Sequence, residues 1–399
     1  MDFELSEEQR ILKKSAKDFF ARELARRTGP ADPRGEDARL RDLLRKMAEL
    51  GWTGLLLPEE YGGSGASFLE LTLLLEEMGY HLCPGPFFSS VVLGGLPVLA
   101  AGSEDQKKNL LPRLASGDLL ITLAFHEPGA GLDAASIQAG AVREGAGTLL
   151  SGTKTFVPDA QLADFFLWVA RTEETRSPEN GVTVFIVDAR STGVCCTPLK
   201  TLARDNPFEV TLDRVRVHPD MVLGEVNRGW PVVENTIEKA GLARAAEMLG
   251  GAQAVLDMAL TYAKERVQFD RPIGSFQVIQ HLFADMWIDI QGSRNLVYHA
   301  AWKVSRGIPA AKEIAMAKAR IGEVYRRVTV SGHQVFGGIG FTMEHTMHEY
   351  HRRSISGDLT FGDSAFQRER VARELGLWEP VESEAPQAGG GEMPGSGGR

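Results

Sequence analysis

The sequence predicts a mainly α-helical protein with a central β-domain, in three folded domains followed by a tail. The first observation is a helical periodicity of apolar residues over residues 1–119. The second is a change to short runs of β-branched and aromatic residues over residues 120–228. The third is a return of long helical patterns over residues 229–377. Residues 378–399 contain few apolar side chains and a run of glycines, so we expect them to be disordered.

The predicted N-terminal domain consists of helices joined by loops that contain Gly and Pro. One apolar stripe runs over residues 40–50 and is closed by Gly51. Ser67 and Glu70 have the spacing of a capping box and start a further helix, which Gly79 can end. The apolar faces of these helices predict the core of the domain.

The predicted central domain contains strands separated by turn residues. Residues 165–170 and 182–187 are apolar runs, and apolar residues alternate over residues 208–212. No helical pattern intervenes, so an antiparallel barrel or sandwich is favoured over a parallel sheet. Residues 147–154 superficially resemble a phosphate-binding loop, but Lys and Thr are in the wrong order and a strand pattern follows. We interpret them as a hairpin turn.

The predicted C-terminal domain is a bundle of four or five long helices. Short breaks near residues 270–274, 306–309 and 337–340 separate the helical patterns. Consecutive helices with short connections pack as antiparallel neighbours.

Composition excludes several classes of function. A net charge of −9 disfavours a surface for nucleic acid or anionic membrane, and no basic patch interrupts the acidic background. Cys83, Cys195 and Cys196 cannot build a disulfide framework, which indicates a reducing compartment. The polar N-terminus lacks the pattern of a secretory signal, and the apolar residues 87–101 are interrupted by Ser, Gly and Pro. We therefore expect a soluble, cytoplasmic protein without a membrane span.

Short motifs typical of unrelated enzyme classes carry little weight in this chain. His345, His348 and His351 recur at three-residue spacing, but a metal site needs a further ligand, so we expect no metal. Ser151 and Lys154 match a Ser-x-x-Lys nucleophile pattern without its companion motifs. No Gly-x-Gly-x-x-Gly follows a strand, which removes the simplest nicotinamide enzyme.

A series of long motifs in a fixed order is more informative. In chain order they are GLLLPEEYGGSG at 54–65, HEPGAGLD at 126–133, GTKTF at 152–156, YAKERVQF at 262–269 with RPIG at 271–274, QVFGGIGF at 334–341 and QRER at 367–370. Over residues 3–377 this order resembles the acyl-CoA dehydrogenase family. The family has a helical N-domain, a central β-domain and a C-terminal helical bundle, in agreement with the three zones of periodicity.

The resemblance implies a flavoprotein that binds FAD and oxidises an acyl-CoA thioester to its α,β-enoyl product. Such an oxidoreductase needs a carboxylate to take the α proton and flavin N5 to accept the β hydride. The electrons then pass to an electron-transfer flavoprotein or a similar acceptor. In the family a neighbouring subunit holds the adenine half of FAD, which implies an oligomer, such as a dimer of dimers, with like or unlike subunits. The corresponding residues here are Arg266, Phe269, Gln277, Gln334, Gly337 and Gly338.

The flavin-ring side departs from the family pattern. The resemblance places Phe125, His126 and Phe156 beside the ring, with His126 where Thr is common and Phe156 where Trp is common. Pro158 stands where a Thr hydroxyl usually faces N5, so that donor is lost.

The catalytic base also departs from the pattern. The two usual positions of the family's Glu align with Phe361 and Ala240, neither of which accepts a proton. Asp363 is our first candidate for the base, although an Asp before a helix commonly serves as an N-cap. Glu238 and Glu247 are further candidates if the alignment shifts along the helix.

These departures are also consistent with two further hypotheses. The chain could be the supporting subunit of a heteromeric, α2β2-like dehydrogenase, since the residues that reach a neighbour's flavin are retained while its own ring side is altered. It could also be a family member repurposed as a flavin oxidase.

Overall fold

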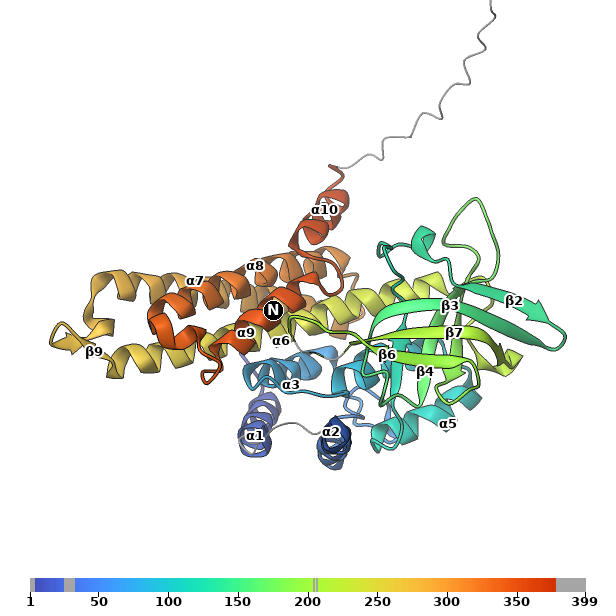
Figure 1. The fold of residues 1–399 in the computed structure, drawn as a ribbon, viewed down its shortest axis with the longest axis horizontal. Helices are drawn as coiled ribbons and strands as arrows, with labels where there is room; N and C mark the ends of the chain where they lie inside the picture. The colour runs from blue at the N-terminus through green and yellow to red at the C-terminus, as the bar shows by residue number, and fades with distance from the viewer. Residues whose placement is uncertain (1–3, 25–32, 204, 206, 378–399) are drawn as a thin grey trace, which may run out of the picture.

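The computed structural model describes residues 4–24, 33–203, 205 and 207–377, and the predicted disordered tail at 378–399 lies outside the described residues. Helices fill the N-terminal and C-terminal parts of this range and strands fill the middle. The predicted fold class, a mainly α protein with a central β-domain, is therefore confirmed. Figure 1 shows the helical bundle extending to one side of the β-domain.

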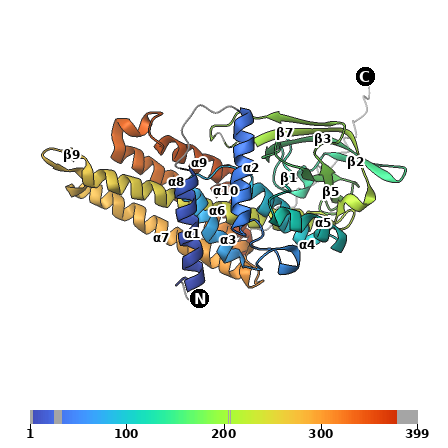
Figure 2. The ribbon, with the colours of Figure 1, turned by 90° about the horizontal axis from the view of Figure 1, so that it is seen from below.

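Besides the short 3-10 turn η1 (Glu59–Tyr61), the described N-terminal residues form five α-helices and one π-helical segment. They are α1 (Glu7–Leu24), α2 (Pro33–Glu49), α3 (Phe68–Tyr80), η2 (Phe88–Gly95), α4 (Leu96–Ala101) and α5 (Glu104–Ala115). Ser67 caps α3 as predicted, because its side chain accepts a hydrogen bond from the amide of Leu69 and the Glu70 carboxylate accepts from the Ser67 amide. Figure 2 shows α1 and α2 lying side by side on the underside of the molecule.

The central part is a sheet with the strand order β6-β7-β3-β2-β4-β5-β8, and β1 pairs with β4. Most neighbours are antiparallel; β1 pairs with β4 in parallel over four residues and β2 meets β4 in parallel at one. The bounds are β1 (Ile121–Ala124), β2 (Gly140–Glu144), β3 (Gly147–Pro158), β4 (Phe165–Arg171), β5 (Val182–Asp188), β6 (Val194–Pro198), β7 (Pro207–Val217) and β8 (Val222–Leu223). Trp168 is fully buried in the sheet's own apolar core.

One local prediction in this domain is wrong. Residues 147–154 are not a hairpin turn; they form the first part of β3, which pairs with β2 and β7. The turn lies just before them, where Gly145 adopts a left-handed φ of +60° between β2 and β3. The segment continues as a strand to Pro158, which is incompatible with a phosphate-binding loop that opens a helix.

The described residues of the C-terminal part form a bundle of three long and two shorter α-helices. They are α6 (Trp230–Glu265), α7 (Gln277–Ser305), α8 (Ala311–Phe336), α9 (Met347–Leu359) and α10 (Ser364–Glu374). A hairpin of β9 (Val267–Gln268) and β10 (Arg271–Pro272) joins α6 to α7, and the turn η6 (Gly337–Phe341) follows α8. The three predicted breaks therefore fall between these helices. Figure 1 shows β9 at the end of the bundle farthest from the sheet.

Close packing of α3 against α6 joins the two helical parts. A methyl group at Gly79 would overlap the carbonyl oxygen of Glu247, and one at Gly250 would overlap the carbonyl oxygen of Glu76. The prediction that Gly79 ends its helix is wrong, because α3 continues to Tyr80 and the glycine instead permits this approach. In the described part of the chain, no helix is both long enough and apolar enough to span a membrane.

Candidate active site

The six residues predicted to hold the adenine half of FAD lie on two neighbouring segments at the far end of the bundle. One is the hairpin from α6 to α7, and the other is the junction of α8 with η6. Tyr262 on α6 and Phe336 on α8 join these segments, with ring centroids 4.9 Å apart. All six residues are exposed to solvent: Arg266, Phe269, Gln277, Gln334, Gly337 and Gly338.

Two of these residues have features that packing within the chain does not require. Phe269 is 86% exposed and holds a left-handed φ of +52°, which is unfavourable for a residue with a side chain. A methyl group at Gly338 would meet no atom within 4 Å, so nothing inside the chain demands glycine there. The bundle end therefore offers an exposed aromatic ring and an uncovered backbone to a group from outside the chain.

The three residues predicted beside the flavin ring form an aromatic cluster on the β-domain. The ring of His126 lies 6.1 Å from that of Phe125 and 5.9 Å from that of Phe156, both nearly edge-on. His126 Nδ1 lies 3.2 Å from Thr155 Oγ1, and burial lowers the pKa of His126, which favours the neutral imidazole. Phe156 is 59% exposed with a left-handed φ of +54°, so a large apolar surface is held outward.

A buried ion pair supports this cluster from beneath. Lys154 Nζ, which is inaccessible to solvent, donates to Glu127 Oε1 at 2.6 Å and to the carbonyl oxygen of Phe125 at 3.1 Å. The Glu127 carboxylate also accepts from the amides of Gln138 and Ala139. Burial lowers the pKa of Lys154 to about 8, while the charge of Glu127 opposes that shift. These bonds fix the loop after β1 against β3.

Sequence reasoning missed the residue that follows Pro158. Asp159 has a left-handed φ of +53°, and its Oδ2 lies 2.6 Å from the hydroxyl oxygen of Ser89 on η2. Burial raises the pKa of Asp159 to about 6. An Asp after a strand looks like an ordinary turn residue, and its partner is distant in sequence, so no spacing pattern identifies the pair.

The two segments where the family's base usually stands meet in space. Phe361 has a left-handed φ of +59°, and its ring stacks on Phe88 with centroids 5.9 Å apart. A methyl group at Gly241 on α6 would lie 4.0 Å from Cβ of Phe361, and the adjacent Ala240 is fully buried. This corner of the structure thus contains apolar side chains in place of a carboxylate.

The acidic candidates for the base are each engaged within the chain. The Asp363 carboxylate accepts a hydrogen bond of 2.8 Å from the Phe366 amide and caps the N-terminus of α10. Glu238 forms an ion pair with Arg370, and Glu247 forms one with Arg244. The assignment of Asp363 as the base stays a prediction.

A cavity of about 260 Å³ is lined in part by Phe88, whose ring also stacks on that of Phe361. Its wall includes Ser89, Asp159 and Arg244, so it is bounded by η2, the end of β3 and α6. The guanidinium carbon of Arg244 is 4.3 Å from the centre of the Phe88 ring. The cavity therefore adjoins the corner that contains Phe361 and is rich in polar groups.

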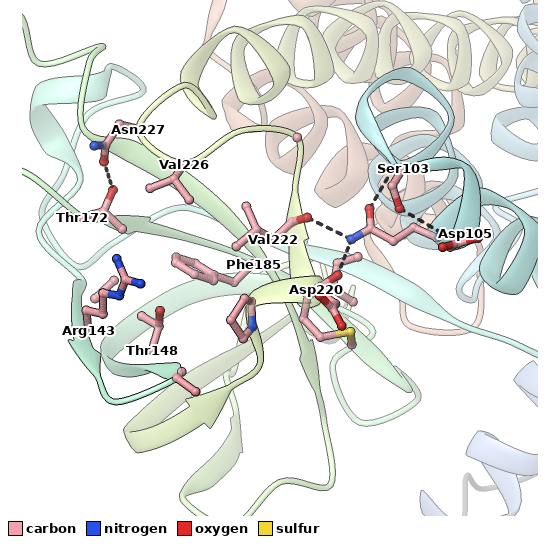
Figure 3. Close-up of a pocket in the computed structure, with 18 of the residues that line it drawn as sticks. Ser103, Asp105, Arg143, Thr148, Thr172, Phe185, Asp220, Val222, Val226 and Asn227 are labelled. Atoms are coloured by element: carbon pink, nitrogen blue, oxygen red, sulfur yellow. Dashed lines mark hydrogen bonds between the residues drawn. The ribbon is translucent and has the colours of Figure 1, made fainter.

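A larger groove of about 860 Å³ lies elsewhere, between α5 and the β-domain (Figure 3). The Gln106 side chain crosses from α5 and donates to the carbonyl oxygens of Asp220 and Val222, and Thr172 donates to Asn227 nearby. None of the predicted site residues lines this groove.

The histidines near the end of the bundle form hydrogen bonds within the chain. His345 Nδ1 accepts from the Met347 amide, and His351 Nδ1 lies 2.9 Å from the hydroxyl oxygen of Thr329. The described residues contain no group of three side chains placed to hold a metal ion.

Three family models match consecutive parts of the chain. The acyl-CoA dehydrogenase N-terminal domain matches residues 6–118, the middle domain matches residues 122–215, and the C-terminal domain matches residues 227–376. A curated relative, the probable acyl-CoA dehydrogenase YngJ of Bacillus subtilis (strain 168), is 34% identical over 381 residues, covering 94% of this chain and all of the relative.

Solved structures agree with this match. A structure described as an FAD-dependent dehydrogenase superposes with a TM-score of 0.86 at 28% identity, covering 95% of this chain and 100% of that one. The ChsE4-ChsE5 complex from Mycobacterium tuberculosis includes a chain with a TM-score of 0.82 at 30% identity, covering 95% and 100% of the two chains. With three domain models in the family's order and full-length relatives, this chain belongs to the acyl-CoA dehydrogenase family of oxidoreductases.

Proposed function

We propose that this chain is an FAD-dependent acyl-CoA dehydrogenase that converts an acyl-CoA into its α,β-enoyl-CoA. The reaction removes an α proton, which requires a base, and a β hydride, so the substrate loses two hydrogens and two electrons. The flavin, when bound, supplies the two-electron acceptor. The observation that carries this proposal is the presence of two exposed surfaces suited to the two ends of FAD.

The residues of these surfaces have chemistry that fits the cofactor. Phe156 and the neutral His126 offer an apolar face to the flat ring, fixed in place by the buried ion pair beneath them. At the bundle end the Arg266 guanidinium can neutralise pyrophosphate, and the amides of Gln277 and Gln334 can bond adenine or backbone oxygens. The open backbone at Gly338 leaves room for close approach.

The separation of the two surfaces supports a site shared between chains. The β9 hairpin and the β-domain lie at opposite ends of the molecule in Figure 1, so one chain cannot place both surfaces on one cofactor. Large apolar side chains are also exposed near the bundle end, namely Val267, Phe269, Ile339, Phe341 and Met343. Such side chains suit burial against a second subunit. A dimer, or a dimer of dimers, satisfies both requirements, with an electron-transfer flavoprotein as the proposed electron acceptor.

A second candidate function is favoured by the corner around Phe361. Phe361 and Ala240 carry no proton acceptor, and the Asp363 carboxylate is used as a helix cap, whereas the bundle-end residues are all present. The chain would then support a catalytic partner in a heteromeric complex, contributing the adenine-side surface. The similarity to a chain of the ChsE4-ChsE5 complex supports this possibility.

Purification of the chain by itself tests both candidates. For a self-sufficient dehydrogenase we expect a visible flavin spectrum at about one flavin per chain, and bleaching of that spectrum by an acyl-CoA under anaerobic conditions. For a supporting subunit we expect a folded but colourless protein that acquires flavin when a family member with an intact Glu motif is co-expressed. A folded protein that binds no flavin in either setting would contradict both.

A further inference from the structure

The cavity beside Phe88 has a polar lining that catalysis alone does not explain. It lies between η2, the end of β3, α6 and α9, with a volume of about 260 Å³. Ionisable groups line it from several elements: Asp159 from the end of β3, Arg244 and Glu247 from α6, and Arg353 from α9. An apolar chain placed here would exclude water from these groups without supplying hydrogen bonds in its place.

The charges around the cavity are mixed in sign. Arg244 and Glu247 form an ion pair, so their charges compensate each other. Arg353 donates to the carbonyl oxygen of Cys83 at 3.3 Å and, among the described residues, forms no ion pair. Asp205 accepts hydrogen bonds of 2.6 Å from the uncharged hydroxyls of Thr201 and of Ser356, which follows Arg353 by three residues on α9. Arg353 and Asp205 thus form no ion pair among the described residues, although both lie close enough to Asp159 to influence its charge.

The carboxyl group of Asp159 can either donate or accept a hydrogen bond, depending on its protonation. The hydroxyl oxygen of Ser89 lies 2.6 Å from Oδ2 of Asp159 and 3.0 Å from the carbonyl oxygen of Pro86. Ser89 has one proton, so it can donate to an ionised Asp159, or donate to Pro86 and accept from a protonated Asp159. Burial raises the pKa of Asp159 to about 6, so both arrangements are accessible near neutral pH.

We propose that this cavity receives the distal part of the acyl group and selects an uncharged chain that carries a hydroxyl group. A hydroxyl can donate to Asp159 or Asp205 and accept from Arg353, whereas an alkyl chain can do neither. A terminal carboxylate could pair with Arg353 but would lie beside Asp159 and Asp205. A terminal ammonium could pair with those two carboxylates but would lie beside Arg353. The inference rests on the proposed function, because it assigns a substrate class to the same site.

A panel of matched CoA thioesters tests the inference with the flavin-loaded protein. The panel is hexanoyl-CoA, 6-hydroxyhexanoyl-CoA, adipoyl-CoA and 6-aminohexanoyl-CoA, and dissociation constants are measured by calorimetry beside kcat/KM. We expect the hydroxylated thioester to bind about tenfold or more tightly than hexanoyl-CoA, which is the scale of one hydrogen-bonded group, and both charged thioesters to bind more weakly than the hydroxylated one. Equal or tighter binding of hexanoyl-CoA would overturn the inference and leave the proposed dehydrogenase intact. Absence of binding and bleaching with every thioester would instead overturn the proposed function, and the inference with it.

Two substitutions of Asp159 test whether this residue causes the preference for the hydroxylated thioester. Asp159→Leu should remove most of the preference for the hydroxylated thioester, whereas Asp159→Asn should keep it, because an amide still donates and accepts. Asp105→Leu is the matched control, since Asp105 lies in the separate groove beside α5 and should leave the preference unchanged. If Asp159→Leu does not fold, the wild-type panel and Asp159→Asn still decide the question. An unchanged preference in a folded Asp159→Leu protein would contradict the assignment.

Discussion

The buried ion pair beneath the aromatic cluster gives the most quantitative prediction. In Lys154→Met the carboxylate of Glu127 loses its charged partner in a place where Lys154 has no solvent exposure. Removing one member of a buried pair costs about 3 to 5 kcal/mol, because the other charge stays buried without compensation. Glu127 retains the hydrogen bonds from the amides of Gln138 and Ala139. We therefore expect the lower end of that range, about 3 kcal/mol.

Urea unfolding followed by circular dichroism measures this loss. The matched control is Arg190→Met, because Arg190 pairs with Asp164 at 3.1 Å with its side chain 83% exposed, and its loss should cost less than about 0.5 kcal/mol. Adding Glu127→Gln to Lys154→Met should restore part of the stability, since the unpaired charge is then removed. Equal losses in Lys154→Met and Arg190→Met, or a double variant that is no more stable than Lys154→Met, would refute the reasoning.

Three further predictions concern stability and the base. Burial raises the pKa of Glu77 from its ordinary 4.5 to about 7, so the folded protein favours the protonated carboxyl. The contribution of this protonation to stability is complete below pH 4.5 and is lost as the pH rises through about 7. Glu77→Gln should therefore gain up to about 3 kcal/mol relative to wild type between thermal melts at pH 5 and pH 8, and parallel pH profiles would contradict this. Gly79→Ala should destabilise the protein by about 2 kcal/mol or more, because the new methyl group overlaps the backbone of α6, whereas Gly292→Ala, which meets no atom within 4 Å on α7, should be neutral or stabilising. Asp363→Asn should keep the stability of the α10 cap and Asp363→Ala should lose about 1 kcal/mol; a base at Asp363 additionally requires that Asp363→Asn abolish turnover in a flavin assay.

Periodicity was sufficient to predict the fold class, because the alternation of helical and strand patterns reflects which faces are buried. The cap at Ser67 was also predictable, since it depends on residues three positions apart. Gly79 was misinterpreted because a glycine near the end of a helical pattern resembles a terminator, while its real role depends on α6, far along the chain. The predicted turn lay a few residues after the real one at Gly145, because a strand that begins with Gly resembles a turn in the sequence.

The candidate site likewise contains residues that could be predicted from the sequence and one that could not. The motifs that carry Arg266 and Phe156 could be recognised from sequence, because each is a continuous segment. Asp159 could not, because its environment is made by Ser89 on η2 and by helices from the other two parts of the chain. The helix-cap role of Asp363 was predictable from its place before a helical pattern, and the structure shows the hydrogen bond that it requires.

The central claim is that FAD is held jointly by the ring-side surface of one chain and the bundle end of another. Co-expression of two defective variants, Arg266→Met and Phe156→Asp, with different affinity tags tests it most directly, with flavin per chain as the readout. Each variant alone should bind little flavin while remaining folded, and the purified hybrid should regain about one flavin per pair of chains, since one of its two shared sites has both intact surfaces. A hybrid as empty as its parents, or a folded Arg266→Met protein with a full complement of flavin, would contradict the shared site.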